Sequence, residues 1–194
     1  MVLTKILKPS VKGIITAVHI LRKGGIVIYP TESSYAIGCD FTNKKAVAYV
    51  VGLKQRPVSK HITVIVDSLK TAKKYCRLNK KEKQLIKEFM PGPLTICAKG
   101  KHFKEFNFRI SSNRIASALA KFLGKPIVAT SANFSNEMPI YESKKLKQFI
   151  GLVDAIIDIG MLPKREVSTV VKVNKETKIL REGAIPKDKI LNKK

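Results

Sequence analysis

Apolar positions along the chain switch between helical and strand spacing from its first segment onward. Residues 11–21 place apolar side chains three and four positions apart behind Ser10, which predicts a helix capped by that serine and ended by Gly24 and Gly25. The continuous apolar run at 26–29 then predicts a short buried strand. The chain thus opens with a helix followed by a strand.

The same two periodicities assign most of the remaining chain. Further helices are expected after a cap at Thr42 or Asn43 and at 69–89, 113–123 and 143–149. Strands are expected at 62–66, 94–98, 106–110, 126–130, 155–159, 169–173 and 178–181. Interleaved helices and strands joined by short loops predict an α/β or α+β sheet covered by helices, and residues 1–194 are interpreted as a single domain.

The net charge narrows the possible binding partners. The 194 residues include 38 Lys and Arg and 14 Asp and Glu, which gives a formal charge of +24. Such a field attracts polyanions such as nucleic acid or nucleotides. Lysine supplies 31 of these residues and arginine only 7. Lysines make solvated point contacts, so a dedicated RNA-binding face and an ordinary solvated surface both remain open.

Cysteine and apolar patterns set the expected environment. Cys39, Cys76 and Cys97 are widely spaced and form no CxxC pair, so neither a disulfide framework nor a zinc site is expected. The histidines show no metal-ligand spacing, and no metal site is predicted from the protein alone. No apolar run approaches the roughly 18 residues of a membrane span. We therefore expect a soluble, cytoplasmic protein with no membrane partner.

Four short polar clusters follow predicted strands or helices, where α/β proteins usually bind ligands. They are Pro30–Ser33, Lys54–Pro57, Ser131–Asn133 and Ser168–Thr169. Neither GxGxxG nor GxxxxGK[ST] occurs, so phosphate binding would depend on individual side chains and local backbone amides. Each cluster taken alone is also compatible with a solvated loop or a helix cap.

Arg109 differs from these clusters because it lies within a predicted apolar strand. Strand alternation places Asn107 and Arg109 on one face and Phe106, Phe108 and Ile110 on the other. A guanidinium in such a strand must reach solvent or meet an anion. The sequence allows either an exposed sheet face or an anion-facing arginine.

Taken in order, these clusters resemble the signatures of the YrdC-like family, the threonylcarbamoyl-AMP synthases. Gly24–Gly38 is similar to G-x-x-x-x-x-P-T-[DE]-T-x-Y-G-L-G, Lys54–Pro57 to K-x-R-P, and Thr130–Ser135 to T-S-A-N-x-S. The same order continues in three further segments: Met90–Thr95 resembles W-P-G-P-x-T, Phe108–Ile110 the arginine strand, and Ser168–Val171 with Ile179–Gly183 the S-T-V-V and L-R-x-G endings. The resemblance spans about residues 10–185.

The resemblance implies a three-layer fold, with a strongly twisted mixed β-sheet around a basic concave cavity. It also implies a nucleotidyltransferase that forms threonylcarbamoyl-AMP from L-threonine, bicarbonate and ATP, releasing pyrophosphate, with Mg²⁺ accompanying the triphosphate. A separate threonylcarbamoyl transferase complex would then modify N6 of adenosine 37 in tRNA. Direct tRNA binding through the basic surface is left open.

Site residues follow by matching motif positions and by the electrostatics of the reaction, in which anionic groups must approach one another. Lys54, Arg56, Ser131 and Asn133 are expected to carry catalysis and bind ATP. Arg109, Ser168 and Arg181 are expected to contact the adenylate as well. Threonine is expected to meet the following residues: Thr31, Ser33, Tyr35 and Arg109.

Four positions depart from the family pattern. Ser33 replaces threonine and keeps a hydroxyl. Ala36 replaces glycine, so it is open whether the backbone at this position needs the positive φ that glycine allows. Met90 replaces tryptophan, and His61 stands where proline or glycine is common.

Two alternative functions remain: a noncatalytic basic RNA-binding module of the same fold, and a related carbamoyl-adenylate reaction as in hydrogenase maturation.

Overall fold

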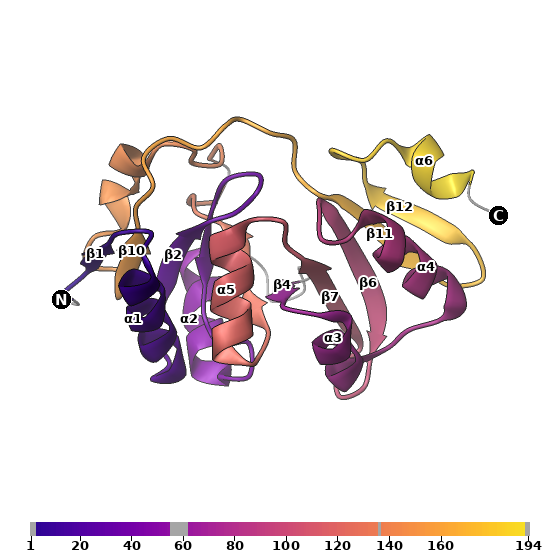
Figure 1. The fold of residues 1–194 in the computed structure, drawn as a ribbon, viewed down its shortest axis with the longest axis horizontal. Coiled ribbons are helices and arrows are strands. Elements are labelled where there is room, and N and C mark those ends of the chain that lie inside the picture. The colour runs from indigo at the N-terminus through magenta and orange to yellow at the C-terminus, as the bar shows by residue number, and fades with distance from the viewer. Residues whose placement is uncertain (1–2, 55–61, 136, 193–194) are drawn as a thin grey trace.

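A computed structural model describes residues 3–54, 62–135 and 137–192 and shows two mixed β-sheets flanked by helices (Figure 1). The five-stranded sheet has the spatial order β1 (Lys5–Leu7), β10 (Ala155–Ile157), β2 (Val27–Pro30), β3 (Tyr35–Gly38) and β9 (Thr130–Ser131). The larger sheet has the order β12 (Thr177–Arg181), β11 (Thr169–Val173), β6 (Leu94–Gly100), β7 (Glu105–Ile110), β4 (Thr63–Val66) and β8 (Ile127–Val128), with β5 (Cys76–Arg77) paired to the end of β6. The predicted α/β class with twisted mixed sheets is confirmed.

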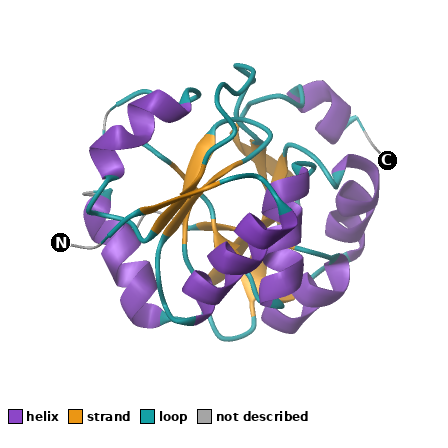
Figure 2. Ribbon diagram, turned by 60° about the vertical axis from the view of Figure 1, so that its left-hand side comes forward, coloured by secondary structure: helices purple, strands orange, loops and turns teal. Residues whose placement is uncertain are grey.

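Helices lie around the outside of these strands (Figure 2). They are α1 (Val11–Arg22), α2 (Lys44–Leu53), α3 (Leu69–Tyr75), α4 (Lys80–Phe89), α5 (Arg114–Leu123), α6 (Lys187–Leu191) and the 3₁₀ helix η1 (Ser143–Phe149). None of the described helices has both the length and the apolar run that crossing a bilayer requires. Leu21 of α1 and Leu119 of α5 share a buried cluster with Val27 and Ile65, one residue from each sheet. This apolar cluster holds the two sheets together.

The strand predicted at 126–130 is divided between the sheets. β8 pairs with β4 in the larger sheet, and β9 pairs with β3 in the smaller sheet, so the chain changes sheets at Ala129. Tyr29 fixes this junction, because its hydroxyl donates to the carbonyl oxygen of Val128 at 2.8 Å. The change of sheet places Ser131 at the edge of the space between them.

Helix ends follow the predicted capping chemistry. Ser10 Oγ accepts from Gly13 N, Asn43 Oδ1 accepts from Ala46 N, and Asn113 Oδ1 accepts from two amides of α5. Gly124 ends α5 with φ of 72°, a left-handed conformation that glycine adopts without a Cβ clash. Asn43 rather than Thr42 is therefore the cap of α2.

The single helix predicted at 69–89 is wrong, because the chain breaks it after Tyr75. Cys76 pairs as a strand with Gly100, which removes its backbone from the helix. Asn79 then starts α4 with a capping box: its Oδ1 accepts from Glu82 N at 2.8 Å, and the Glu82 carboxylate accepts from Asn79 N at 2.8 Å. Helical periodicity alone did not reveal this restart.

A connection of residues 158–168 links the smaller sheet to the larger one and arches over the space between them (Figure 1). Tyr35 of β3 anchors its beginning, because the Tyr35 hydroxyl donates to Gly160 O at 3.0 Å and accepts from Ile159 N at 3.1 Å. The connection ends at Ser168, directly before β11. Ser168 is thereby brought opposite the β2–β3 loop.

Candidate active site

A cavity of about 370 Å³ lies between the two sheets. Its walls come from the β2–β3 loop, α2, β7, the β8–β9 junction and the end of the 158–168 connection. Eight of the ten predicted site residues line it: Thr31, Ser33, Lys54, Arg109, Ser131, Asn133, Ser168 and Arg181. Arg56 lies outside the described residues. Segments spread from residue 31 to residue 181 thus meet in one space of the size that small-molecule sites have.

Lys54 lies at the C-terminal end of α2, and only 2% of its surface is exposed. Its Nζ donates to Ser131 O at 2.8 Å, to Asn133 Oδ1 at 2.6 Å and to the carbonyl oxygen of Asn133. An ammonium group has three hydrogens, and these three contacts use all of them. Lys54 therefore fixes the 131–133 loop, and a direct bond to phosphate would require one of these contacts to be exchanged.

The side chains of Ser131 and Asn133 complete this network. Ser131 Oγ donates to Asn133 Oδ1 at 2.5 Å, and Asn133 Nδ2 donates to Glu137 O at 2.5 Å. Both lone pairs of Asn133 Oδ1 are then occupied, whereas Ser131 Oγ retains acceptor capacity toward the cavity. The positive charge of Lys54 and the two polar side chains form one rigid unit in the cavity wall.

Thr31 organises the β2–β3 loop. Its Oγ1 donates to Ser34 O at 2.7 Å and lies 3.3 Å from the amides of Ser33 and Ser34 and from Ser33 Oγ. Because the Thr31 hydroxyl hydrogen is used within the loop, this residue shapes the loop more directly than it contacts a ligand. Ser33 and Ser34 also line the cavity, and their hydroxyl groups can rotate toward a ligand.

Tyr35 is not among the residues that line the cavity. Its ring is buried, its hydroxyl holds the 159–160 backbone, and burial raises the pKa of that hydroxyl. The predicted contact of Tyr35 with threonine is not supported by this placement. Tyr35 instead fixes the connection that ends at Ser168.

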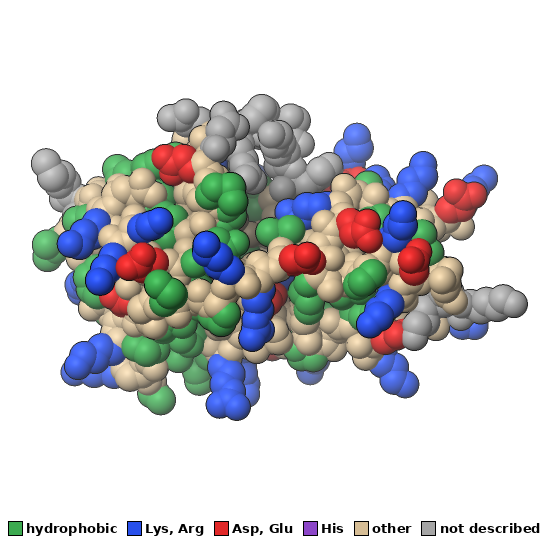
Figure 3. All heavy atoms as spheres, turned by 90° about the horizontal axis from the view of Figure 1, so that it is seen from above, with side chains coloured by type: hydrophobic (Ala, Val, Ile, Leu, Met, Phe, Trp, Pro, Cys, Tyr) green, Lys and Arg blue, Asp and Glu red, His purple; other side chains and the backbone are tan. Residues whose placement is uncertain are grey.

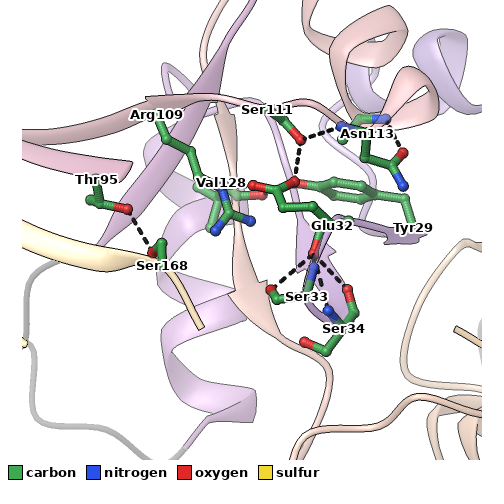
Figure 4. A network of polar contacts seen from close by, with 12 residues as sticks. Tyr29, Glu32, Ser33, Ser34, Thr95, Arg109, Ser111, Asn113, Val128 and Ser168 are labelled. Carbon is green, nitrogen blue, oxygen red and sulfur yellow. Dashed lines mark hydrogen bonds and ion pairs between the residues drawn. The ribbon is translucent and has the colours of Figure 1, made fainter. Parts of the chain in front are cut away.

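Arg109 faces the cavity from β7, and 8% of its side chain is exposed. Its Nε lies 3.2 Å from Glu32 Oε1, but the N–H is not aligned with that oxygen, so the contact is an ion pair rather than a well-formed hydrogen bond. Ser111 donates to the other carboxylate oxygen of Glu32 (Figure 4). No residue that the structure describes accepts a hydrogen bond from the terminal Nη atoms of Arg109. This anion-facing arrangement resolves the alternative that the sequence left open.

Ser168, directly before β11, and Arg181, at the end of β12, line the cavity from the same sheet as Arg109. Arg181 Nη2 donates to Ser168 O at 2.8 Å and to Ser168 Oγ at 3.0 Å, and Nε donates to Ser168 O at 3.1 Å. Thr95 Oγ1 lies 2.8 Å from Ser168 Oγ, so the two hydroxyls share a hydrogen (Figure 4). Thr95 was missed as a site-supporting residue, although it ends the Met90–Thr95 motif.

Ala36, one of the departures noted above, lies in the regular strand β3 and lines the cavity. It pairs with Tyr29 on one side and Ser131 on the other, as an extended residue does. The position does not require a left-handed backbone, so alanine adds only a methyl group to the wall. His61, the other unexplained departure, lies outside the described residues.

The cavity contains fixed cations, hydroxyls and an apolar wall that includes Val47, Val50 and Val51. Burial raises the pKa of the three cysteine thiols to between about 11 and about 12, so they remain protonated near neutral pH and are poor nucleophiles. Among the described residues, no three His, Cys, Asp or Glu side chains are grouped to hold a metal ion. The site is therefore suited to bind and orient an anionic ligand.

Two twisted sheets with a cavity between them that is lined by Lys54, Arg109 and Arg181 define the class: an α/β protein whose intersheet cavity has the charge to suit an anionic small molecule. The sequence profile of the Sua5/YciO/YrdC family, described as telomere recombination, matches residues 19–183. The chain belongs to this family.

Individual relatives agree with that assignment. The chain is 34% identical to an uncharacterized protein of Haemophilus influenzae, over 91% of both chains, and 30% identical to the uncharacterized protein YciO of Escherichia coli, over 90% of this chain and 91% of YciO. The crystal structure of E. coli YciO superposes with a TM-score of 0.87 at 28% identity, over 98% of this chain and all of YciO. A variant of P. abyssi Sua5 superposes with a TM-score of 0.92 at 25% identity, but this chain spans only 59% of that protein.

Proposed function

We propose that this protein is an L-threonylcarbamoyl-AMP synthase, a nucleotidyltransferase acting on ATP. Bicarbonate carboxylates the threonine amine with loss of water, and a carbamate oxygen then attacks the α-phosphorus of ATP. The new P–O bond forms as the bond to pyrophosphate breaks. The family membership and the eight predicted residues in one cavity support this proposal, and the finer reaction is what the experiment below tests.

The observation that carries the proposal is the guanidinium of Arg109. It is almost fully buried and faces the cavity, and among the residues that the structure describes its side chain is paired only at Nε, with Glu32. A buried cation with an uncommitted terminal edge is a strong site for a carboxylate or phosphate, since these anions accept two parallel hydrogen bonds from it. P. abyssi Sua5, a structural relative, has been crystallised with L-threonine.

Catalysis would come from positioning and electrostatics rather than from a protein nucleophile. Lys54 would supply a fixed positive charge behind the 131–133 loop, with Ser131 as a hydrogen-bond acceptor toward the ligand. Arg56, by motif position, would contact the phosphates. Ser168 and Arg181 would contact the adenylate from the larger sheet, which also carries Arg109.

Magnesium fits this site as part of the substrate. Glu137 lines the cavity, and its Oε2 already accepts from Phe134 N at 3.1 Å, whereas Glu32, which is not among the lining residues, has Arg109 and Ser111 on its two oxygens. Mg²⁺ would therefore be held mainly by phosphate oxygens and water, a coordination it commonly adopts. When bound, it would neutralise part of the triphosphate charge.

The proposed product is a mixed anhydride that would pass to a threonylcarbamoyl transferase complex acting on tRNA. The alternative of a noncatalytic RNA-binding module predicts one broad basic surface. On the face shown in Figure 3, lysine and arginine side chains are spread out with acidic side chains between them. This distribution favours the cavity over that face as the functional feature.

The test is pyrophosphate release by the purified protein with ATP and Mg²⁺. We expect release only when L-threonine and bicarbonate are both present, and no release when either is omitted. Arg109→Ala should reduce the rate at least 100-fold, in the range that loss of one preorganised electrostatic contact produces. Unchanged ATP under complete conditions would favour the RNA-binding alternative.

A further inference from the structure

Glu32 is a buried carboxylate that the proposed reaction does not use directly. Only 7% of its side chain is exposed, and it is absent from the residues that line the cavity. It follows β2 in the smaller sheet, whereas its partners Arg109 and Ser111 belong to β7 of the larger sheet and the turn after it. Its contacts therefore cross from one sheet to the other (Figure 4).

Each oxygen of Glu32 has a separate partner. Oε1 lies 3.2 Å from Arg109 Nε, and Oε2 accepts the hydroxyl hydrogen of Ser111. Ser111 Oγ accepts in turn from Asn113 N at 3.2 Å, the residue that caps α5. The carboxylate is thus held from behind by a capped helix and faces the guanidinium from one fixed direction.

The edge of Arg109 that Glu32 occupies has a geometric consequence. A guanidinium presents its donors along distinct edges, and a carboxylate at Nε leaves the outer Nη edge directed elsewhere. Only 8% of the Arg109 side chain is exposed, so the surrounding atoms leave it little room to change its path. Fixing the Nε side therefore determines where the Nη atoms point.

The burial of Arg109 also depends on this partner. An uncompensated buried charge is costly, and the residues described around Arg109 offer Glu32 as its carboxylate. Without that carboxylate, the guanidinium would be expected to turn toward solvent or toward other acceptors. Loss of the Glu32 carboxylate would then move the Nη atoms of Arg109 away from the ligand, and would not make them more available to it.

We propose that Glu32 is the positioning residue of the site: it orients Arg109 from across the sheet boundary so that the Nη edge meets the anionic ligand in the cavity. The identity of that ligand as a substrate carboxylate or phosphate rests on the proposed function. The orientation of the guanidinium itself does not.

The first arm of the test is structural and does not depend on activity. Crystal structures of the wild type, Glu32→Gln and Glu32→Ala would be compared at the Arg109 guanidinium. We expect it to leave its wild-type position in Glu32→Ala, and Glu32→Gln to keep the fold while changing the guanidinium orientation. A guanidinium in the wild-type position in both variants would overturn the proposal.

The second arm is kinetic and uses pyrophosphate release. We expect Glu32→Gln to lower kcat/KM roughly 10- to 100-fold, as loss of a supporting contact behind a ligand-binding group does, and Glu32→Asp to recover part of that loss. Ser111→Ala, which leaves the carboxylate in place, should have a smaller effect. A Glu32→Gln enzyme with unchanged or higher kcat/KM would overturn the proposal. If the wild type releases no pyrophosphate, the proposed function fails, and the structural arm still decides the role of Glu32.

Discussion

Lys54 shows how much a single residue contributes beyond its charge. The sequence motif predicted a phosphate contact, and the structure places Nζ on three oxygens of residues 131 and 133. The motif therefore identified the correct cavity residue but not its partners. Partners of this kind are not readable from spacing, because Lys54 and Asn133 are 79 positions apart in the chain.

Replacing Lys54 should affect stability as well as activity. Lys54→Ala or Lys54→Met removes the donor to the carbonyl oxygen of Asn133, whereas Ser131 O still accepts from Asn133 N and Asn133 Oδ1 still accepts from Ser131 Oγ. One buried acceptor left without a donor costs about 1–3 kcal/mol before relaxation. We expect urea unfolding to show a loss of at least about 1 kcal/mol, together with loss of pyrophosphate release. Arg109→Lys serves as the matched control, since it keeps a cation beside Glu32 and should preserve stability better. Wild-type stability in Lys54→Met would show that the network does not hold the loop.

Glu32 and Tyr35 mark the limits of motif-based prediction at this scale. Both lie inside the Gly24–Gly38 signature, yet only the structure separates their roles. Tyr35 was assigned to the ligand and holds the 159–160 backbone, whereas Glu32 received no role and contacts Arg109. A motif records which residues recur together and does not show which way each side chain points.

At the scale of elements, the sequence predicted the helices and strands whose capping residues and apolar spacing lie within the element itself. The α1 and α5 helices carry caps and apolar spacing within themselves, and β11 matches its predicted bounds, Thr169–Val173. The β1 and β3 strands were missed. β1 is a three-residue edge strand defined by its pairing with β10, and β3 by its pairing with β2, so neither has enough local signal.

The restart of α4 gives a prediction for an element. Asn79 both caps the helix and donates from Nδ2 to Val173 O at 3.2 Å. Asn79→Ala should destabilise the fold by about 1 kcal/mol, the usual cost of losing a side-chain cap. The measurement is the shift in the urea midpoint of unfolding. Asn174→Ala serves as the control, because Asn174 is an exposed asparagine directly after β11. Equal midpoints for the two variants would show that the cap does not stabilise the helix.

At the scale of the whole molecule, the site exists because two sheets meet. The β8–β9 strand passes from one sheet to the other, and the 158–168 connection returns to the larger sheet, so both walls of the cavity depend on changes of sheet. The fold class was predictable from interleaved helices and strands. The division into two sheets was not, since the apolar run at 126–130 gives no indication that it changes partners at Ala129.

The whole molecule is proposed to use the fixed cations of this cavity to hold ATP and the threonine carbamate together for acyl-adenylate formation. The direct measurement is chromatography of reactions containing ¹⁴C-bicarbonate, L-threonine, ATP and Mg²⁺, with wild-type protein and Arg109→Ala side by side. We expect the wild type to transfer label into a product that also contains AMP, and Arg109→Ala to do so at least 100-fold more slowly. A wild-type protein that forms no such labelled adenylate, or an Arg109→Ala variant that forms it at the wild-type rate, would show that these cations do not carry this reaction.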